Sequence, residues 1–401
     1  MTEGATGQAV PFVRRVRVRN FRSLADCDVS LGPLTVLLGF NASGKTNFLD
    51  ALRFVADALA SSPQRAVEGR GGLEALLHRA QAGAAESFEI WVDLGLRLPG
   101  VDCDVAASYG FEIGRYPDTQ TPLLVLREAG VVQLSGGPLQ LPLDVARHSA
   151  RLRLPASTID DESPQAVLET TLRSMRFYEL DSTVLRALDE QGTGKASLGS
   201  SGEHLGRVLG DLARVDELGK ERLDAYLSAL VPGALGVDER REGRYSTVQA
   251  RFQAGDGGGV EVFLREELSE GTLRAAGVLA ALFQPPVSAG RVPLVAIEEP
   301  ETALHPAGVG ALYEALDDAS ARTQVIVTSQ SSDLLDNEHV RLEHLRAVAN
   351  IDGVTRIGKV DAAGRAVVDK GLMSISELHR SGQMRPELPD AVRQSAGGRH
   401  C

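Results

Sequence analysis

A glycine-rich stretch between an apolar run and a helical pattern constrains this chain most. Residues 39–48 read GFNASGKTNF, which places Gly39, Gly44, Lys45 and Thr46 in the pattern G-x-x-x-x-G-K-[ST]. Glycines let the backbone wrap closely around a polyphosphate, and amides at a helix N-terminus point at it. We therefore expect Lys45 to reach the β- and γ-phosphates of a nucleotide and Thr46 to ligate Mg²⁺ through its hydroxyl.

The rest of the loop and its flanks fit the same interpretation. Asn41 and Ser43 are small polar residues that suit a loop crowded by phosphate oxygens, and Ala42 and Asn47 complete the expected nucleotide-binding set. The run LTVLL before the loop predicts a buried strand, and residues 43–60 after it have apolar positions near helical spacing. The alternative, a glycine-containing helix start with an exposed lysine, is weaker in this strand-to-helix context.

Two adjacent acids end a second apolar run. In PLVAIEEPETALHP, residues 293–306, four apolar residues lead into Glu298 and Glu299. Two carboxylates at the end of a buried strand are costly unless they meet a cation or a proton donor. We expect Glu298 to belong to the Mg²⁺ shell and Glu299 to orient and deprotonate the attacking water. The alternative is a solvated strand end that carries two acids.

A third segment, ELSEGTLRAAGVLAAL at residues 267–282, predicts a helix with a polar start. Ser269 or Thr272 can cap this helix, and Gly271 allows a close approach of another backbone. A helix N-terminus with a hydroxyl and glycine amides favours an anion. Taken alone, an ordinary capped helix is the better interpretation, and the position just before the two-acid strand favours the anion site.

A fourth segment, VIVTSQSSDLLD at residues 325–336, predicts a strand that ends in polar residues. The strand is expected to end in Thr328, Ser329 and Gln330, which could sense the γ-phosphate beside the carboxylates. The alternative is a polar loop between a strand and a helix.

Five arginines cluster near the N-terminus. Arg14, Arg15, Arg17, Arg19 and Arg22 alternate with other residues, so that several fall on one face of a strand. They could bind a nucleic-acid backbone, and Arg22 could approach the nucleotide. For most of them a solvated strand face is the favoured interpretation.

Composition limits the partners and the compartment. The 401 residues carry a net charge of −12, so any nucleic-acid contact requires a local basic patch. The cysteines, Cys27, Cys103 and Cys401, have no metal-ligand spacing and are expected to be free thiols. The sequence has neither a signal peptide at its start nor an apolar run long enough to span a membrane. We expect a cytoplasmic protein without a membrane partner.

The order of elements predicts an α/β fold whose core is interrupted. Strand, loop and helix come first, strands are expected near 86–98, 106–114 and 122–135, and residues 155–243 have a largely helical pattern. Strand–helix–strand returns at the back, as in a core with an inserted β lobe and helical lobe. The expected division is a flexible tail at 1–10, the N-terminal core with the β lobe at 11–150, an insertion lobe at 151–260, the C-terminal core at 261–385, and a flexible tail at 386–401.

The motifs and their order resemble a known family. VRVRNFRSL followed by LLGFNASGKTNFLDAL resembles the opening of the SMC/RecF-like ATPases, which belong to the ABC-type ATPase group. LSEGTLR resembles the signature motif of that group, LVAIEEPETALHP its Walker B motif and D-loop, and IVTSQSSDLLD its switch region. The chain is most similar to stand-alone bacterial AAA-family ATPases related to RecF and to the ATPase half of OLD-type nucleases. Residues 130–260 carry the resemblance only weakly.

This resemblance implies a fold and a mechanism. It implies a P-loop NTPase with an ABC-type head, a β lobe and a helical insertion, which binds ATP with Mg²⁺. Two protomers would sandwich two ATPs, with the loop and acids of one facing Ser269 and Gly271 of the other, and hydrolysis would loosen the dimer. Many relatives carry a histidine where this chain has Gln330. An amide can donate a hydrogen bond but cannot become cationic, so we expect slow hydrolysis.

Three functions follow from the resemblance. The leading one is an ATP-hydrolysing switch that dimerises around ATP and acts in DNA repair or recombination, or in anti-phage defence. The alternative is a slow ATPase scaffold that regulates a separate toxin, effector or nuclease protein. An OLD-type nuclease is less favoured, because only residues 337–401 follow the switch region, which is short for a domain and contains no D-x-D pair. A transport ATPase is disfavoured by the NFRS and EEPETALHP forms of its motifs.

Overall fold

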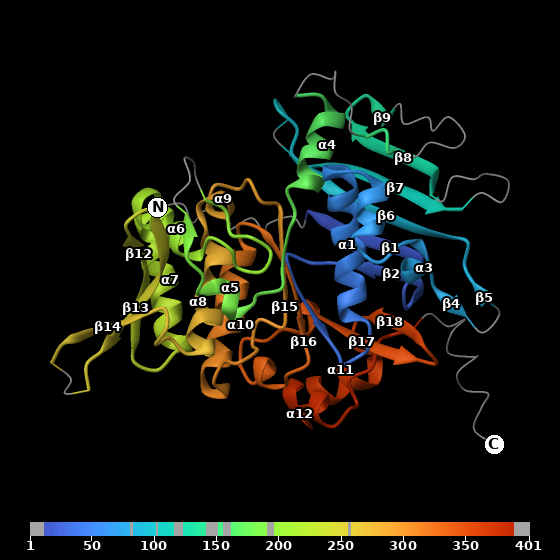
Figure 1. The fold of residues 1–401 in the computed structure, drawn as a ribbon. Coiled ribbons are helices and arrows are strands. Elements are labelled where there is room, and N and C mark those ends of the chain that lie inside the picture. The colour runs from blue at the N-terminus through green and yellow to red at the C-terminus, as the bar shows by residue number, and fades with distance from the viewer. Residues whose placement is uncertain are drawn as a thin grey trace, which may run out of the picture. The chain divides into compact units, whose positions relative to one another are not determined.

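The computed structural model describes residues 12–80, 83–101, 103–115, 123–141, 151–154, 162–190, 196–255 and 258–388. The chain forms two compact units, which are drawn in Figure 1. The first comprises Met1–Met175, Leu342–Leu372 and Gly382–Cys401, and the second comprises Arg176–Arg341 and Met373–Ser381. The segment 151–260, expected as one insertion lobe, therefore contributes to both units.

A six-stranded antiparallel sheet dominates the first unit. Its order is β2-β1-β6-β7-β8-β9. The strands are β1 (Val13–Phe21), β2 (Leu24–Ser30), β6 (Ser87–Leu96), β7 (Val105–Gly114), β8 (Leu124–Leu134) and β9 (Gly137–Gln140). β1 alternates buried valines with more exposed arginines, so one face of the sheet is apolar and the other is charged. β1 pairs antiparallel with β2, which lies in the segment LADCDVSL.

Helices cover the apolar face of this sheet. In Figure 1, α1 (Lys45–Ala60) and α4 (Pro164–Arg173) lie side by side against it. Phe54 of α1 meets Phe21 and Phe88 edge to face, with ring centroids 6.1 and 5.3 Å apart, and Phe111 lies 6.0 Å away. Large buried aromatic rings contribute much of a core's hydrophobic stabilisation. This cluster fixes the helix that follows the glycine-rich loop.

A parallel strand pair carries the loop in the first unit. β3 (Leu34–Leu38) is buried along its whole length and pairs in parallel with β17 (Leu345–Ile351), which forms a hairpin with β18 (Val354–Gly358). The remaining elements of this unit are α2 (Pro63–Glu68), α3 (Leu73–Leu76), β4 (Arg79–Ala80), β5 (Gly83–Ala84), η2 (Leu342–His344) and α11 (Ala362–Asp369).

The second unit holds a parallel sheet of three strands. β15 (Leu294–Glu298) lies between β10 (Arg176–Tyr178) and β16 (Gln324–Ser329), in a register that sets Glu298 opposite Thr328. The helices α8 (Glu270–Phe283) and α10 (Pro306–Ser320) pack on each other and on these strands. Shorter elements are α5 (Ser182–Leu185), α9 (Pro285–Ser288), η1 (Asp333–Leu335) and α12 (Ile375–Arg380).

The same unit contains a four-stranded antiparallel lobe. It consists of β11 (Asp189–Glu190), β12 (Ala234–Glu242), β13 (Tyr245–Gln253) and β14 (Val260–Leu264), with α6 (Leu205–Val215) and α7 (Glu217–Leu230) packed against it (Figure 1). The predicted helical pattern over 155–243 is wrong for β12. The charged residues of β12 are typical of a surface helix, so the sequence pattern does not indicate a strand. In the structure they pair with neighbours: Asp238 forms ion pairs with Lys220 at 3.1 Å and with Arg251 at 2.7 Å.

The structure tests the expectations for membrane spans, cysteines and the chain ends only in part. In the described residues no helix has both the length and the apolar character that a membrane crossing requires. Cys27 is a buried free thiol whose pKa is raised by burial to about 12, and Cys103 is an exposed free thiol. Cys401 and the expected tail at 1–10 lie outside the described residues, as does the C-terminal tail from residue 389. Pro386, at the expected start of that tail, bridges to Val360.

Candidate functional site

The glycine-rich loop joins β3 to α1 in a conformation that only small residues tolerate. Gly44, the residue before α1, has φ +101°, and Ala42 has φ +61°. A Cβ on Gly44 would lie 1.9 Å from Thr355 Oγ1, and one on Gly39 would lie 2.3 Å from the carbonyl oxygen of Val348. Close packing therefore requires glycine at both positions, and at Gly44 the positive φ favours it as well. The structure confirms a tight loop at the predicted strand-to-helix junction.

Lys45 and Ser43 place polar groups inside the loop. The Lys45 side chain is 5 % exposed, and its Nζ donates hydrogen bonds to the carbonyls of Gly39 (2.7 Å) and Phe40 (3.1 Å). The Ser43 hydroxyl is buried and finds no hydrogen-bond partner among the described residues. A buried hydroxyl without a partner is uncommon and costly, and a phosphate oxygen could accept from it.

Two residues that the sequence did not single out support the loop. Thr355 of β18 donates through Oγ1 to the carbonyl of Ser43 (2.9 Å) and lies 2.7 Å from the hydroxyl of Ser23. Asn47, predicted to contact the nucleotide, donates its amide to Ser23 Oγ at 2.6 Å. Ser23 belongs to the NFRS motif and could have been found there. Thr355 stands in an ordinary strand sequence that gives no signal.

The exposed part of the loop and the nearby arginine differ in their surroundings. Asn41, Ala42 and Thr46 are exposed, while Arg22 is partly buried. Arg22 has φ +50°, and its guanidinium pairs with Asp50 of α1 at 2.9 Å. The structure therefore brings Arg22 to the helix that the loop opens. Its predicted contact with a nucleotide stays a prediction.

In the second unit, Glu298 and Glu299 stand at the end of β15. Glu298 is its last residue, and Glu299 has φ +43°, in the left-handed region where a non-glycine residue is uncommon. The amide of Glu299 donates to both the carbonyl and the hydroxyl of Thr328, at 3.1 Å each. Strained backbone of this kind gathers at functional sites. Here the end of β16 holds it in place.

Gln330 and Glu299 meet. The Gln330 side-chain amide donates to Glu299 Oε2 at 3.1 Å. Both side chains are at least partly exposed, so a ligand can reach them. Of the predicted catalytic set, the structure thus brings together the expected base and the expected switch residue. The hydrogen bond from the Gln330 amide orients one oxygen of the Glu299 carboxylate.

Glu301, in the turn after the acids, was not predicted as a site residue. It is buried, and its Oε1 accepts a 2.5 Å hydrogen bond from Ser329 Oγ, while Oε2 has no partner among the described residues. Burial raises the pKa of the Glu301 carboxyl, the hydrogen bond from Ser329 opposes this, and the nearby charge of Glu299 adds to it. Its position in the EEPET turn is the signal that could have found it.

The predicted signature segment forms the start of α8. Ser269 is the capping residue: its Oγ accepts from the amide of Thr272 at 3.1 Å and lies 2.8 Å from the Thr272 hydroxyl. A Cβ on Gly271 would lie 2.5 Å from the carbonyl oxygen of Ala303. The close backbone approach expected at Gly271 is therefore made by the turn after Glu301, within the same chain. Contact of Ser269 and Gly271 with an ATP stays a prediction.

The arginine-rich strand is balanced by acids. Arg17 pairs with Asp93 at 3.0 Å and Arg19 with Asp26 at 3.4 Å, and Arg15 is bonded to Asp28. Each partner lies on a neighbouring strand, so the charges alternate across the outer face of the sheet. The favoured interpretation of a solvated strand face holds for these residues. A nucleic-acid backbone would have to displace their acidic partners.

The residues present fit a magnesium nucleotide. The loop offers a buried hydroxyl without a partner and two glycines that leave room only for backbone. Mg²⁺ keeps several waters and is usually held by one or two carboxylates together with substrate phosphates. The described residues contain no group of three or more His, Cys, Asp or Glu side chains able to enclose a metal.

Solved structures show the same fold. The crystal structure of an SmcHead bound to the C-winged helix domain of ScpA matches with a TM-score of 0.53 and 17% identity, covering 88% of this chain and 100% of that one. The Smc head domain with an extended coiled coil from Pyrococcus furiosus, bound to the C-terminal domain of ScpA, matches with a TM-score of 0.51 and 13% identity. It covers 90% of this chain and 100% of that one. The predicted α/β fold with an ABC-type head is confirmed.

Family comparisons and curated relatives agree with the fold. Residues 12–82 match the family described as "AAA ATPase domain", and residues 141–336 match the one described as "AAA domain, putative AbiEii toxin, Type IV TA system". The OLD nuclease of Thermus scotoductus is 24% identical over 361 residues, which are 84% of this chain. The DNA replication and repair protein RecF of Allorhizobium ampelinum is 36% identical over 104 residues, 25% of this chain and 24% of RecF. Together these comparisons support a similarity of the chain to SMC/RecF-like ATPases of the ABC type.

The relatives differ in how much of their length this chain covers. The chain spans 62% of the Thermus scotoductus OLD nuclease. The RecF match covers 104 residues, about a quarter of either protein. The comparisons therefore support the fold of this chain and its similarity to these proteins.

Proposed function

We propose that this protein is an ATP-binding and ATP-hydrolysing switch. The observation that carries the proposal is the loop between β3 and α1, where Gly39 and Gly44 leave no room for a side chain and the buried Ser43 hydroxyl has no partner among the described residues. A polyphosphate satisfies such a loop through its backbone amides and its lysine. In this proposal residues 39–47 hold the nucleotide, and Arg22 contacts it as well.

Each catalytic group has a role that its surroundings support. Lys45 neutralises the β- and γ-phosphates, and Glu299 accepts the proton of the attacking water. Gln330 donates to Glu299 Oε2 at 3.1 Å and so leaves the other carboxylate oxygen to face the water. Because the amide stays neutral, it adds less stabilisation to the developing negative charge than a cation would, and turnover is slow.

The metal belongs to the same proposal. Thr46, exposed in the first turn of α1, and Glu298, at the end of β15, hold Mg²⁺ through a hydroxyl and a carboxylate. When bound, the ion neutralises charge on the phosphates. The chain's own contribution is to supply these two oxygen ligands from a helix start and a strand end.

ATP joins two copies of the chain. The start of α8, with Ser269 and Gly271, presents amides and a hydroxyl to the γ-phosphate bound by the partner protomer. Hydrolysis removes this shared ligand, and the dimer then loosens. The state of the nucleotide thereby controls the state of assembly.

Replacing Ser269 by Ala tests the two roles of this residue. Loss of the cap should lower the free energy of unfolding by about 1 kcal/mol, which urea titration measures. The matched control is Ser163→Ala, because Ser163 caps α4 through an equivalent 3.2 Å bond to Ala166. Both variants should lose similar stability, and only Ser269→Ala should also lose ATPase activity. Equal ATPase activity in the two variants would leave Ser269 with the capping role alone.

The pathway we favour is DNA repair, recombination or defence against foreign DNA. The similarity to a protein named for DNA replication and repair and to an OLD nuclease supports it. The acid-paired arginines of β1 make that strand a weak candidate for the DNA contact. Any duplex would therefore be bound elsewhere on the ATP-bound dimer.

A second candidate function rests on a specific observation. The family matched by residues 141–336 is described by a toxin of a type IV toxin–antitoxin system. The protein would then act as a slow ATPase that regulates a separate toxin, effector or nuclease. Its net charge of −12 favours a protein partner over a nucleic acid.

ATP turnover with and without DNA tests the proposal. We expect Mg²⁺-dependent hydrolysis by the purified protein that Lys45→Ala abolishes. A several-fold stimulation by duplex or single-stranded DNA supports the first candidate, and stimulation only by a co-purified protein supports the second. Metal-dependent cleavage of a plasmid would add a nuclease function. A wild-type protein that neither binds nor hydrolyses ATP at millimolar concentration would refute the proposal.

A further inference from the structure

Glu301 is an acidic residue in a buried position, which is unusual for a carboxylate. Its side chain is 8 % exposed, one carboxylate oxygen has no partner among the described residues, and the negative Glu299 lies two residues before it. Burying a carboxyl group is costly unless hydrogen bonds compensate. The compensation here comes from the end of β16, where Ser329 donates to Glu301 at 2.5 Å.

Ser329 ties together the chain on both sides of Gln330. Its hydroxyl is fully buried, and besides donating to Glu301 it accepts a 3.1 Å hydrogen bond from the amide of Ser331. Ser331 in turn accepts from the amide of Asp333 at 3.1 Å. Side-chain bonds of this type fix a turn by replacing backbone ones. The residue between the two serines is the one that contacts Glu299.

The same strand end therefore holds both partners of the Glu299–Gln330 contact. Thr328 binds the amide of Glu299, Ser329 binds Glu301, and Gln330 donates to the Glu299 carboxylate at 3.1 Å. Glu299 and Glu301 belong to one turn, and residues 328–330 belong to one strand end. The first link holds the backbone of Glu299, the second joins the side chains of Ser329 and Glu301, and the third is the contact between Gln330 and Glu299.

We propose that Ser329 and Glu301 are positioning residues for ATP hydrolysis: their buried hydrogen bond fixes Gln330 against Glu299. This inference rests on the proposed function. Neither residue touches the nucleotide in this scheme. They act by holding the turn of residues 299–301 and the strand end of residues 328–330 in one arrangement, so that the amide and the base keep their contact during turnover.

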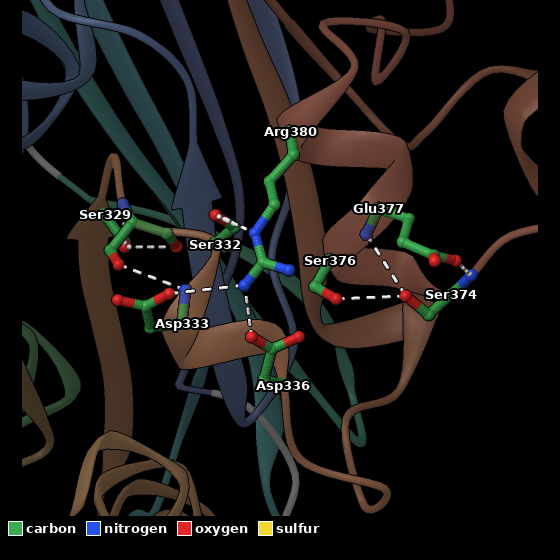
Figure 2. Close-up of polar contacts among 9 residues, drawn as sticks. Ser329, Ser332, Asp333, Asp336, Ser374, Ser376, Glu377 and Arg380 are labelled. Atoms are coloured by element: carbon green, nitrogen blue, oxygen red, sulfur yellow. Dashed lines mark hydrogen bonds and ion pairs between the residues drawn. The ribbon is translucent and has the colours of Figure 1, made fainter. Parts of the chain in front are cut away.

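The loop that follows Gln330 is anchored separately at residues 332–336. Figure 2 shows Arg380 of α12 reaching Ser332, Asp333 and Asp336, with bonds of 3.1 Å to Ser332 Oγ and 3.3 Å to Asp333 Oδ1. A hydrogen bond from Ser376 and, after it, the ion pair with Arg380 hold the pKa of Asp336 below its usual range. Ser332 thus anchors the same loop without touching Glu301 or Ser329, and it provides a matched control.

The test compares Ser329→Ala with Ser332→Ala. Both remove one hydroxyl from the same loop, but only the first breaks the bond to Glu301. We expect Ser329→Ala to lower kcat roughly 10- to 100-fold with the Kd for a non-hydrolysable ATP analogue unchanged. Ser332→Ala should stay within about twofold of the wild type in both quantities. Equal kcat values for the two variants would overturn the proposal.

The partner side of the bond gives a second comparison. Glu301→Gln keeps an oxygen acceptor of the same length, so it should retain most of kcat, whereas Glu301→Ala should lose as much as Ser329→Ala. The double variant Ser329→Ala/Glu301→Ala should be no slower than either single one, because both remove the same contact. Additive losses, or a Glu301→Gln variant as slow as Glu301→Ala, would refute the pair.

Two further measurements distinguish a failure of this inference from a failure of the proposed function. Unfolding of the nucleotide-free single and double variants in urea measures the coupling of Ser329 and Glu301 without any turnover, and it identifies a variant that fails to fold. We expect non-additive losses of stability there as well. A wild-type protein without ATPase activity refutes the proposed function. A wild-type ATPase whose Ser329→Ala variant turns over normally refutes only the positioning pair.

Discussion

Replacing Glu299 by Gln is expected to lower kcat for ATP roughly 10²- to 10⁴-fold and to leave the Kd for ATP within about twofold of the wild type. The substitution keeps the shape of the side chain and its place at φ +43°, and it removes the oxygen that would accept a proton from water. ATP binding depends on the loop before α1, which the variant does not alter. Turnover is measured by phosphate release, and binding by titration calorimetry.

The same variant should change the state of assembly. If ATP joins two protomers and its hydrolysis releases them, Glu299→Gln should accumulate as a dimer in the presence of ATP and Mg²⁺, which light scattering after size exclusion detects. The control is Glu338→Gln, since the side chain of Glu338 is 88 % exposed and lies outside the proposed site. Normal hydrolysis by Glu299→Gln would show that another group is the base. An ATP-bound variant that stays monomeric would contradict the dimer alone.

The parts of the site that the sequence predicted well are those set by neighbours in the chain. The glycine-rich loop follows a run of five buried residues in β3 and opens α1, and both elements have strong local patterns. Glu298 and Glu299 likewise stand at the end of an apolar strand whose limits the sequence shows. In such places local propensity and tertiary structure agree.

The parts that could not be predicted depend on contacts between distant residues. Thr355 supports the loop through a bond to Ser43, 312 positions earlier, and nothing in its own segment marks it. Arg380 reaches the loop after Gln330 from a short helix that the sequence did not indicate. β12 carries charges typical of a surface helix because its outward side chains find oppositely charged partners. Tertiary pairing overrides local pattern in each case.

Gly44→Ala should weaken ATP binding on the order of 100-fold, because the added Cβ forces the loop away from its place. That Cβ would lie 1.9 Å from Thr355 Oγ1, and Thr355 cannot withdraw without breaking its bonds to Ser43 and Ser23. Displacing the loop misplaces both the amides at the start of α1 and the Lys45 ammonium, which contacts the carbonyl of Gly39. The Kd for ATP and the unfolding free energy are the two quantities to measure.

Gly72→Ala separates this clash from the cost of the backbone conformation. Gly72 also has a positive φ, +94°, with ψ 172° where Gly44 has ψ 14°, and an added Cβ there meets no atom within 4 Å. Both alanines should lose roughly 1–3 kcal/mol of stability from their backbone conformations. Gly44→Ala should lose a further 1–3 kcal/mol or so from overpacking, together with its ATP affinity, while Gly72→Ala should bind ATP as the wild type does. If Gly44→Ala kept wild-type affinity for ATP, the shape of the loop would not be what holds the phosphates, and the proposed role of its glycines in ATP binding would be refuted.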